Sequence, residues 1–167
     1  MFYEQVFKKL NKKRVRYLVV GGIAVNLHGF PRVTGDLDIM LDLKDGKSVN
    51  GFVEVVKALS FKPKIPVEVD DFAINSKREL WIKEKHMKVF SVYNPSNEIE
   101  HIDVLTENLI DFESAYKSRK VINAGNLEVP VVSIDDLIKL KKISGRKRDE
   151  IDIAALKEIK IVKNEKK

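Results

Sequence analysis

The sequence predicts an α+β fold, in which a small mixed β-sheet is flanked by helices and followed by a helical C-terminal section. Helical and strand-like patterns follow one another without the strict alternation of a doubly wound domain. A length of 167 residues, with 44% hydrophobic and 34% charged residues, is enough for one compact domain with a buried core. We therefore expect residues 1–167 to form a single domain, with the sheet and its helices in about 1–132, C-terminal helices in about 133–161 and a flexible tail in 162–167.

The N-terminal part predicts a helix, a strand, a short helix, a long strand and a longer helix. Apolar residues recur at helical spacing in Phe2–Lys13, whereas Val15–Val20 is rich in the apolar residues of a buried strand. Ile23–His28 is typical of a short helix, which the glycine and proline after it would stop. Arg32–Leu41 alternates polar and apolar residues, as a strand does, and Lys47–Ser60 carries apolar residues along one helical face.

The middle of the chain predicts a hairpin after a less regular segment. Phe61–Glu68 contains two prolines and is expected to be a loop or an edge. Val69–Lys83 has no clear period, so we expect a crossover of mixed structure there. His86–Tyr93 and Glu98–Leu105 are both strand-like, and the Asn-Pro-Ser-Asn segment between them favours a turn.

The C-terminal part is mainly helical. We expect a short helix over Asn108–Lys117 and a strand over Leu127–Val132. Ser133 is placed to cap a helix that runs to about Gly145, because the two aspartates after it suit the first helical turn. Arg148–Ile161 predicts a final helix.

Composition excludes several classes of function. The chain contains no cysteine, which excludes a disulfide scaffold, a thiolate metal site and a cysteine nucleophile. No basic segment followed by an apolar one begins the sequence, and the longest apolar run, Tyr17–Leu27, is too short to span a bilayer. We expect a cytoplasmic protein with no membrane partner. The formal charge of +6 fits either solvated helix faces or a polyanionic partner such as RNA or a nucleotide.

A glycine pair separates the first predicted strand from the helix after it. In a strand, Gly-Gly, helix arrangement, the backbone amides at the helix start can face a phosphate, and glycine lets the ligand approach closely. Gly21 and Gly22 are therefore candidate phosphate-binding residues. A tight strand end without any ligand is the alternative.

The next predicted strand has one polar face and one apolar face. The apolar face can enter the core, and the polar face carries Arg32, Thr34, Asp36 and Asp38. Carboxylates two residues apart on a strand can flank cations in a two-metal site, and hard oxygen ligands favour Mg²⁺ or Mn²⁺. The alternative is an exposed acidic strand face in which Arg32 pairs with Asp36.

A third carboxylate occurs in another apolar strand. Asp103 lies between Ile102 and Val104, and a buried strand rarely carries a lone aspartate without a partner. A third carboxylate is also what activation of an incoming hydroxyl requires. His101 shares the face of Asp103 by strand alternation, so it either lines the same cleft or is a surface histidine.

These residues together carry a family resemblance. The glycine pair, an Asp-hydrophobic-Asp pair and a later aspartate between hydrophobic residues occur in the order Gly21-Gly22, Asp36-Leu37-Asp38 and Ile102-Asp103-Val104. In this pattern the chain resembles the DNA polymerase beta-like nucleotidyltransferase superfamily. Its local sequence is most similar to the minimal bacterial and archaeal members, which include the abortive-infection (AbiEii-like) toxins.

The resemblance extends into the C-terminal part. The residues that resemble the segment where those proteins carry a nucleotide-facing lysine are Asp136-Leu137-Ile138, Lys141, Gly145-Arg146 and Asp149. The resemblance covers most of Val15–Leu156, and Lys47–Lys85 is its unmatched middle. It implies a nucleotidyltransferase fold whose active face carries the three aspartates.

The resemblance also implies roles. Asp36 and Asp38 would hold two Mg²⁺ (or Mn²⁺) ions on a nucleoside triphosphate such as ATP, and Asp103 would bind the metal that lowers the pKa of the acceptor hydroxyl. Gly21 and Gly22 would cradle the β and γ phosphates. The triphosphate would be oriented by Arg32, Thr34, Lys141 and either Arg146 or Arg148; for the last, a pair with Asp149 across the helix start is the alternative.

The implied function is the metal-dependent transfer of a nucleoside monophosphate (NMP) from a nucleoside triphosphate (NTP) to an acceptor hydroxyl. The acceptor is open among RNA such as a tRNA end, a protein and a small molecule, and one option is a toxin with an antitoxin partner. A different class of function is a non-catalytic module that binds nucleotide or nucleic acid on the same fold. A phosphohydrolase that uses the same metals is a weaker third reading.

Overall fold

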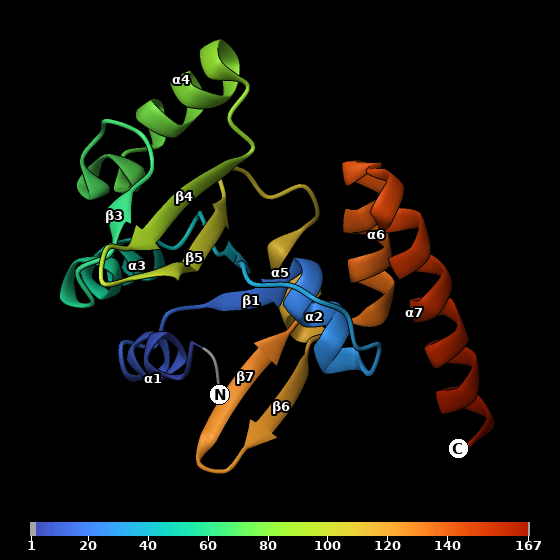
Figure 1. The fold of residues 1–167 in the computed structure, drawn as a ribbon. Helices are drawn as coiled ribbons and strands as arrows, with labels where there is room; N and C mark the ends of the chain where they lie inside the picture. The colour runs from blue at the N-terminus through green and yellow to red at the C-terminus, as the bar shows by residue number, and fades with distance from the viewer. Residues whose placement is uncertain (1–2, 167) are drawn as a thin grey trace.

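Figure 1 shows the computed structural model, which describes residues 3–166. Its elements in the first half of the chain are α1 (Glu4–Lys12), β1 (Tyr17–Val20), α2 (Gly21–His28), β2 (Leu37–Leu41), α3 (Gly46–Ala58), β3 (Lys62–Pro63) and the 3₁₀ helix η1 (Val69–Ala73). Those in the second half are α4 (Asn75–Lys85), β4 (Val89–Asn94), β5 (Asn97–Leu105), α5 (Phe112–Lys117), β6 (Lys120–Ala124), β7 (Leu127–Val131), α6 (Ile134–Ser144) and α7 (Lys147–Glu165).

All strands join one mixed seven-stranded sheet in the order β3-β4-β5-β2-β1-β7-β6. β2 runs antiparallel to β1 and parallel to β5, while β4 and β5 form the expected antiparallel hairpin. In Figure 1 helices α6 and α7 lie side by side, well apart from the strands β4 and β5. The α+β fold class predicted from the sequence, with a mixed sheet and a helical C-terminal section, is confirmed.

One face of the sheet is closed by an aromatic core. Phe72 of η1 packs against Phe52 of α3 and Phe90 of β4, with ring centroids 5.4 and 5.2 Å apart. Trp81 of α4 stacks on Phe90 at 5.4 Å. These rings bury large apolar areas, so α3, η1 and α4 are fixed on the face of β4 that carries Phe90. The neighbouring residues of β4 and β5 point to the other face.

The two C-terminal helices are joined by a buried ion pair network. Ser133 caps α6 as expected, since its hydroxyl accepts a hydrogen bond from the Asp136 amide at 3.2 Å. Lys141 of α6 is only 4% exposed, and its ammonium lies 2.9 Å from Asp149 and 2.7 Å from Asp152 of α7. A buried cation with two carboxylate partners holds the two helices in one relative position.

The prediction of a strand over Arg32–Leu41 is wrong about where the strand starts, because β2 begins at Leu37. The Asn26 side chain of α2 donates a hydrogen bond to the Arg32 carbonyl and accepts one from the Arg32 amide, both at 2.9 Å. These two bonds tie the backbone at Arg32 to α2. The polar face of the predicted strand is therefore divided between a loop and the first residues of β2.

Other element bounds also differ. β6 was not predicted, and it forms a hairpin with β7. The helix expected from Asn108 begins only at Phe112. Helix α7 continues to Glu165, so residues 162–165 are helical rather than part of a flexible tail. Phe2 and Lys167, included in the predicted first helix and tail, lie outside the described residues. Between residues 3 and 166, no helix has the length and apolar character needed to cross a membrane.

The network between α6 and α7 can be tested by removing its lysine. Lys141→Met is expected to lower the free energy of unfolding by about 3 kcal/mol, because two buried carboxylates lose a cation and retain only Arg32 and Arg146. Lys139→Met removes an exposed pair with Asp136 and should cost below about 1 kcal/mol. Urea unfolding of both variants measures the difference, and equal losses would contradict a structural role of Lys141.

Candidate functional site

Two of the three predicted aspartates lie opposite each other on neighbouring strands. Asp38 of β2 pairs with Asp103 of β5 in the parallel register, so both side chains are on the same face of the sheet. Asp36 precedes β2 and is exposed, with its carboxylate 3.9 Å from the His101 ring. The aspartates, 65 residues apart in sequence (103 − 38), are thus brought together by one strand pairing.

Asp36 is held near this pair by the N-terminal helix region. The Tyr3 hydroxyl donates to the Gly35 carbonyl at 2.5 Å and accepts from the His101 amide at 3.0 Å. This side chain therefore bridges the residue before Asp36 and the strand β5. The His101 ring lies beside Asp36, which favours the alternative of a cleft residue over that of a plain surface histidine.

Asp38 is in an unfavourable place for a carboxylate. Burial first, and then the nearby charges of Asp103 and Asp36, raise the pKa of Asp38 to about 7. The Gly22 amide donates a hydrogen bond to Asp38, and Arg146 also favours its charged form, but neither offsets the burial. A cation placed between these carboxylates would relieve both their repulsion and their desolvation.

The glycine pair lies directly against the carboxylate site. Gly21 has a φ of +64°, and a Cβ there would come within 2.0 Å of Asp38 Oδ2. A Cβ on Gly22 would come within 2.6 Å of the Thr34 hydroxyl. α2 begins at Gly21, so its first amides and the carboxylates share one surface. The predicted phosphate turn and the predicted metal site are parts of one site.

One polar residue at the site was missed in the sequence. Ser91 of β4 lies opposite Asp103, and its hydroxyl donates a hydrogen bond to Asp103 Oδ1 at 2.5 Å. This bond holds the carboxylate in one orientation and leaves its second oxygen for another partner. An assignment of the strand register in the β4–β5 hairpin would have placed Ser91 opposite Asp103.

The predicted cations near the site have partners in α7. Arg32 pairs with Asp152 rather than with Asp36, and Lys141 contacts the same carboxylate. Asp149 bonds Lys141 and the Arg146 guanidinium, the latter at 3.2 Å, so the alternative of an Arg148–Asp149 pair is not observed.

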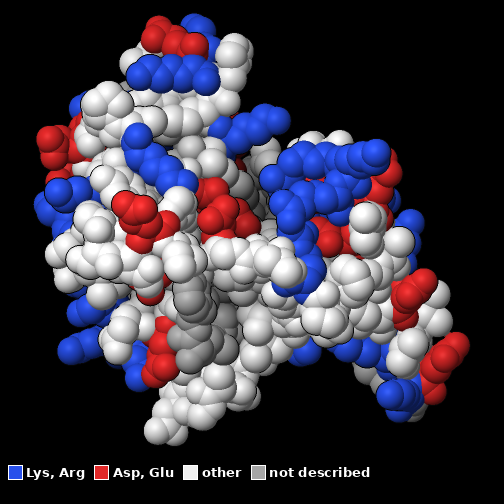
Figure 2. Space-filling model, viewed as in Figure 1, with Lys and Arg blue, Asp and Glu red and all other residues white. Residues whose placement is uncertain are grey.

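The exposed Arg146 is the cation whose charge reaches Asp38. Figure 2 shows the molecular surface in the orientation of Figure 1. Acidic side chains lie in a hollow, and Lys and Arg side chains at the junction of α6 and α7 face them.

The donor set fits a divalent cation that is shared with a ligand. Within residues 3–166 no three His, Asp or Glu side chains already converge on a point that a metal ion would fill. Asp38 and Asp103 do offer adjacent carboxylate oxygens. Mg²⁺ is usually bound by one or two carboxylates together with substrate phosphates and water, so two carboxylates beside a helix start are sufficient.

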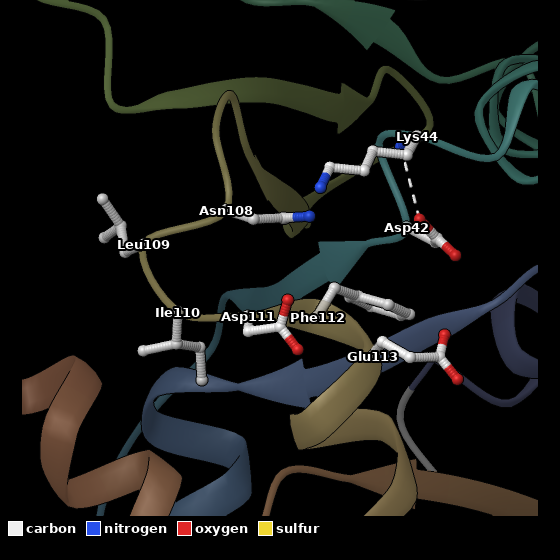
Figure 3. Close-up of a pocket in the computed structure, with 8 residues that line it drawn as sticks. All are labelled: Asp42, Lys44, Asn108, Leu109, Ile110, Asp111, Phe112 and Glu113. Carbon is white, nitrogen blue, oxygen red and sulfur yellow. Dashed lines mark hydrogen bonds between the residues drawn. The ribbon is translucent and has the colours of Figure 1, made fainter.

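A separate cavity of about 520 Å³ lies at the other end of β2. Figure 3 shows it between the segment after β2 and the segment leading into α5, with the Lys44 ammonium and the Asn108 side chain pointing toward one another. Its lining includes Asp42 and Asp111 but none of the predicted site residues. We therefore assign the functional site to the hollow with Asp38 and not to this cavity.

Comparisons with known proteins identify the family and the fold of the chain. A family model described as "Nucleotidyltransferase of unknown function (DUF6036)" matches residues 3–165. Among solved structures, the lincosamide antibiotic adenylyltransferase LnuA, bound to lincomycin, is 18% identical with a TM-score of 0.57, over 93% of this chain and 96% of that chain. The fold of LnuA is thus matched over almost the whole length of both chains.

Two further structures have the same fold. ANT(2″)-Ia in complex with adenylyl-2″-tobramycin is 10% identical, with a TM-score of 0.57, over 94% of this chain and 90% of that chain. An antigenic nucleotidyltransferase-like protein from Paracoccidioides brasiliensis is 17% identical, with a TM-score of 0.56, over 90% of this chain and 71% of that chain. No curated protein sequence matches the chain. The specific relation to AbiEii-like toxins stays a prediction.

The raised pKa of Asp38 predicts a pH-dependent stability in metal-free protein. Between its unfolded value of 3.8 and about 7, the folded chain keeps a proton that the unfolded chain lacks, so stability falls as pH rises through this window. Asp38→Asn should therefore be more stable than wild type at pH 8, by up to about 4 kcal/mol, with the difference vanishing toward pH 4.

Urea unfolding in the presence of a chelator, from pH 4.5 to 8, measures this difference. The exposed Asp70→Asn variant serves as the control and should follow the wild-type pH dependence. Parallel curves for Asp38→Asn and wild type would contradict the raised pKa of the partly buried carboxyl at position 38.

Proposed function

The chain belongs to the nucleotidyltransferase family that matches residues 3–165, and from that membership we propose that it transfers an NMP from an NTP to an acceptor hydroxyl with the help of a divalent cation. The observation that carries the proposal is the contact between the glycine turn and the carboxylates. Gly21 and Gly22 leave no room for side chains, because Asp38 and Thr34 occupy the adjoining space. A phosphate-binding turn and an oxygen-rich cation site therefore meet at one surface.

In this proposal, some site residues would act on the triphosphate and others on the acceptor hydroxyl. Asp36, Asp38 and Asp103 would hold Mg²⁺ or Mn²⁺, which supplies positive charge on the phosphates and lowers the pKa of the acceptor hydroxyl. The amides at the start of α2 face the β and γ phosphates. The hydroxyl oxygen attacks the α-phosphorus, the bond to pyrophosphate breaks, and the proton leaves toward the free oxygen of Asp103.

Cations at the rim would orient the triphosphate. Thr34 lies against Gly22, and the Arg32 backbone is bonded to Asn26 of α2; both residues remain proposed nucleotide contacts. Arg146 is exposed and close enough to influence Asp38, so we assign it a phosphate contact as well. Lys141 was proposed as a direct contact. Since it is buried between Asp149 and Asp152, its contribution is better explained by holding the start of α7, whose N-cap residue is Arg146.

One observation favours a second candidate function. The carboxylates of the described residues do not form a complete metal cluster by themselves, which would also suit a module that binds nucleotide or nucleic acid without catalysis. The two functions differ in one product, because only a transferase releases pyrophosphate. Adenylyl transfer is named for LnuA, whereas for this chain the use of ATP, a cytoplasmic location and a role as a toxin with an antitoxin partner stay proposals.

The catalytic proposal predicts loss of function without loss of fold. Asp38→Asn and Asp103→Asn should each lower Mg²⁺-dependent pyrophosphate release from NTP and cell RNA by about 100-fold or more, because one charge of the cation site is removed. Asp135→Asn, an exposed residue on α6, should release pyrophosphate as wild type does. Thermal unfolding checks that all variants are folded. Release at the wild-type rate by both site variants would refute the proposed catalytic role.

The contact between the glycine turn and Asp38 gives a second test. Gly21→Ala should abolish Mg·NTP binding, because its methyl group must displace the Asp38 carboxylate and because a positive φ is strained for alanine. Gly35→Ala is the matched control, since a methyl group there meets no atom within 4 Å. Isothermal titration with Mg·NTP compares the two. Equal affinities would show that the turn does not determine the nucleotide site.

A further inference from the structure

The sheet face that carries the aspartates continues onto two more strands. Ser91 of β4 lies opposite Asp103, and the Ser91 carbonyl accepts a hydrogen bond from the Lys64 amide at 2.9 Å. Two residues further along the strands, Tyr93 lies opposite His101, and Lys62 lies opposite Tyr93. Directly opposed residues share a face, so two rows run from the carboxylates to the lysines at the sheet edge.

This part of the face is open. Ser91, Tyr93, His101 and Asp103 are all partly exposed, and Lys62 and Lys64 are exposed. By contrast, the residues that alternate with them are fully buried under α3, η1 and α4: Phe90, Val92, Ile102 and Val104. In Figure 1 the C-terminal helices stand at a distance from β4 and β5, and the hollow of Figure 2 lies between them.

The side chains at the far end of the face are available for a ligand. In the described part of the chain, neither the Lys62 nor the Lys64 ammonium forms an ion pair, although the nearby Lys57 and Lys77 do. The Tyr93 ring stacks on no other ring among residues 3–166, and its hydroxyl forms no hydrogen bond there. Glu100, an acidic residue of the same hairpin, accepts a hydrogen bond from Asn94.

The order of groups along the face specifies an acceptor. Neighbouring strands are about 4.8 Å apart, so the lysine edge lies two strands, or roughly 10 Å, from Asp103. A hydroxyl at Asp103 would be followed by a flat ring over Tyr93 and then by negative charge at Lys62 and Lys64. Aromatic side chains stack bases of any sequence, and lysines neutralise phosphates. A polycationic acceptor would meet the like charge of both lysines.

We propose that the acceptor is the 3′ end of a single-stranded RNA, with its terminal hydroxyl at Asp103, a base on Tyr93 and upstream phosphates at Lys62 and Lys64. This rests on the proposed nucleotidyl transfer. The terminal oxygen forms a bond to the α-phosphorus of the NTP, the bond from that phosphorus to pyrophosphate breaks, and the hydroxyl proton is released. The RNA is thereby extended by one nucleotide.

The binding test uses a fluorescently labelled single-stranded RNA of twelve nucleotides, without NTP, with anisotropy as the readout. Lys62→Ala/Lys64→Ala should weaken binding about tenfold or more and reduce the slope of log K against log salt by about 1.4. Tyr93→Ala should weaken it about tenfold, while Tyr93→Phe keeps the stacking face and binds as wild type does. Lys12→Ala/Lys47→Ala removes the same charge from exposed positions of α1 and α3 and should have little effect.

The transfer test offers the chain radiolabelled NTP with the same RNA, the RNA with a blocked 3′ end, free AMP and purified cell protein. Labelling of the unblocked RNA alone supports the proposal. Labelling of AMP or protein instead, or equal weakening of RNA binding by the control lysine variant, overturns it. If wild type binds Mg·NTP and Asp38→Asn does not, the nucleotide site stands even when the RNA variants behave as wild type, so failure of this inference is distinguishable from failure of the proposed function.

Discussion

Asp38 and Asp103 face each other across a parallel strand pair, at a depth where burial raises the pKa of Asp38 to about 7. Two carboxylates in this arrangement destabilise the folded chain unless protons or cations accompany them. The surrounding groups reduce that cost only in part: an amide of the glycine turn bonds one carboxylate, and Ser91 bonds the other. Under the proposed function, a cation carried in by a polyanion would relieve the remaining cost.

Much of this arrangement could be predicted from the sequence because it depends on local patterns. The strand before Gly21, the helix after it and the apolar neighbours of Asp103 follow from short-range spacing, and they are confirmed. Other features depend on partners distant in sequence. β2 starts late because the Asn26 side chain holds the Arg32 backbone, and nothing in the alternating pattern of Arg32–Leu41 indicates that competition.

The cations illustrate the same limit. The resemblance implies a nucleotide contact for Lys141, yet its partners lie on the next helix and bury it. Arg32 meets Asp152, which is 120 residues away. Ser91 belongs to the site only through the hairpin register. Residue type and spacing thus indicated which side chains lie at the candidate site, whereas the pairing of charges depends on the packing of α6 and α7.

Asp152 forms ion pairs with two separate segments. Its partners are Arg32 in the loop before β2 and Lys141 of helix α6. Removing any one of the three leaves the others buried with unbalanced charge, so the effects of substitutions at these positions cannot be independent. Over evolutionary time such positions are constrained to change together, or through intermediates that keep the charge balance. Covariation of positions 32, 141 and 152 among family members would then indicate a contact that cannot be inferred from any single sequence.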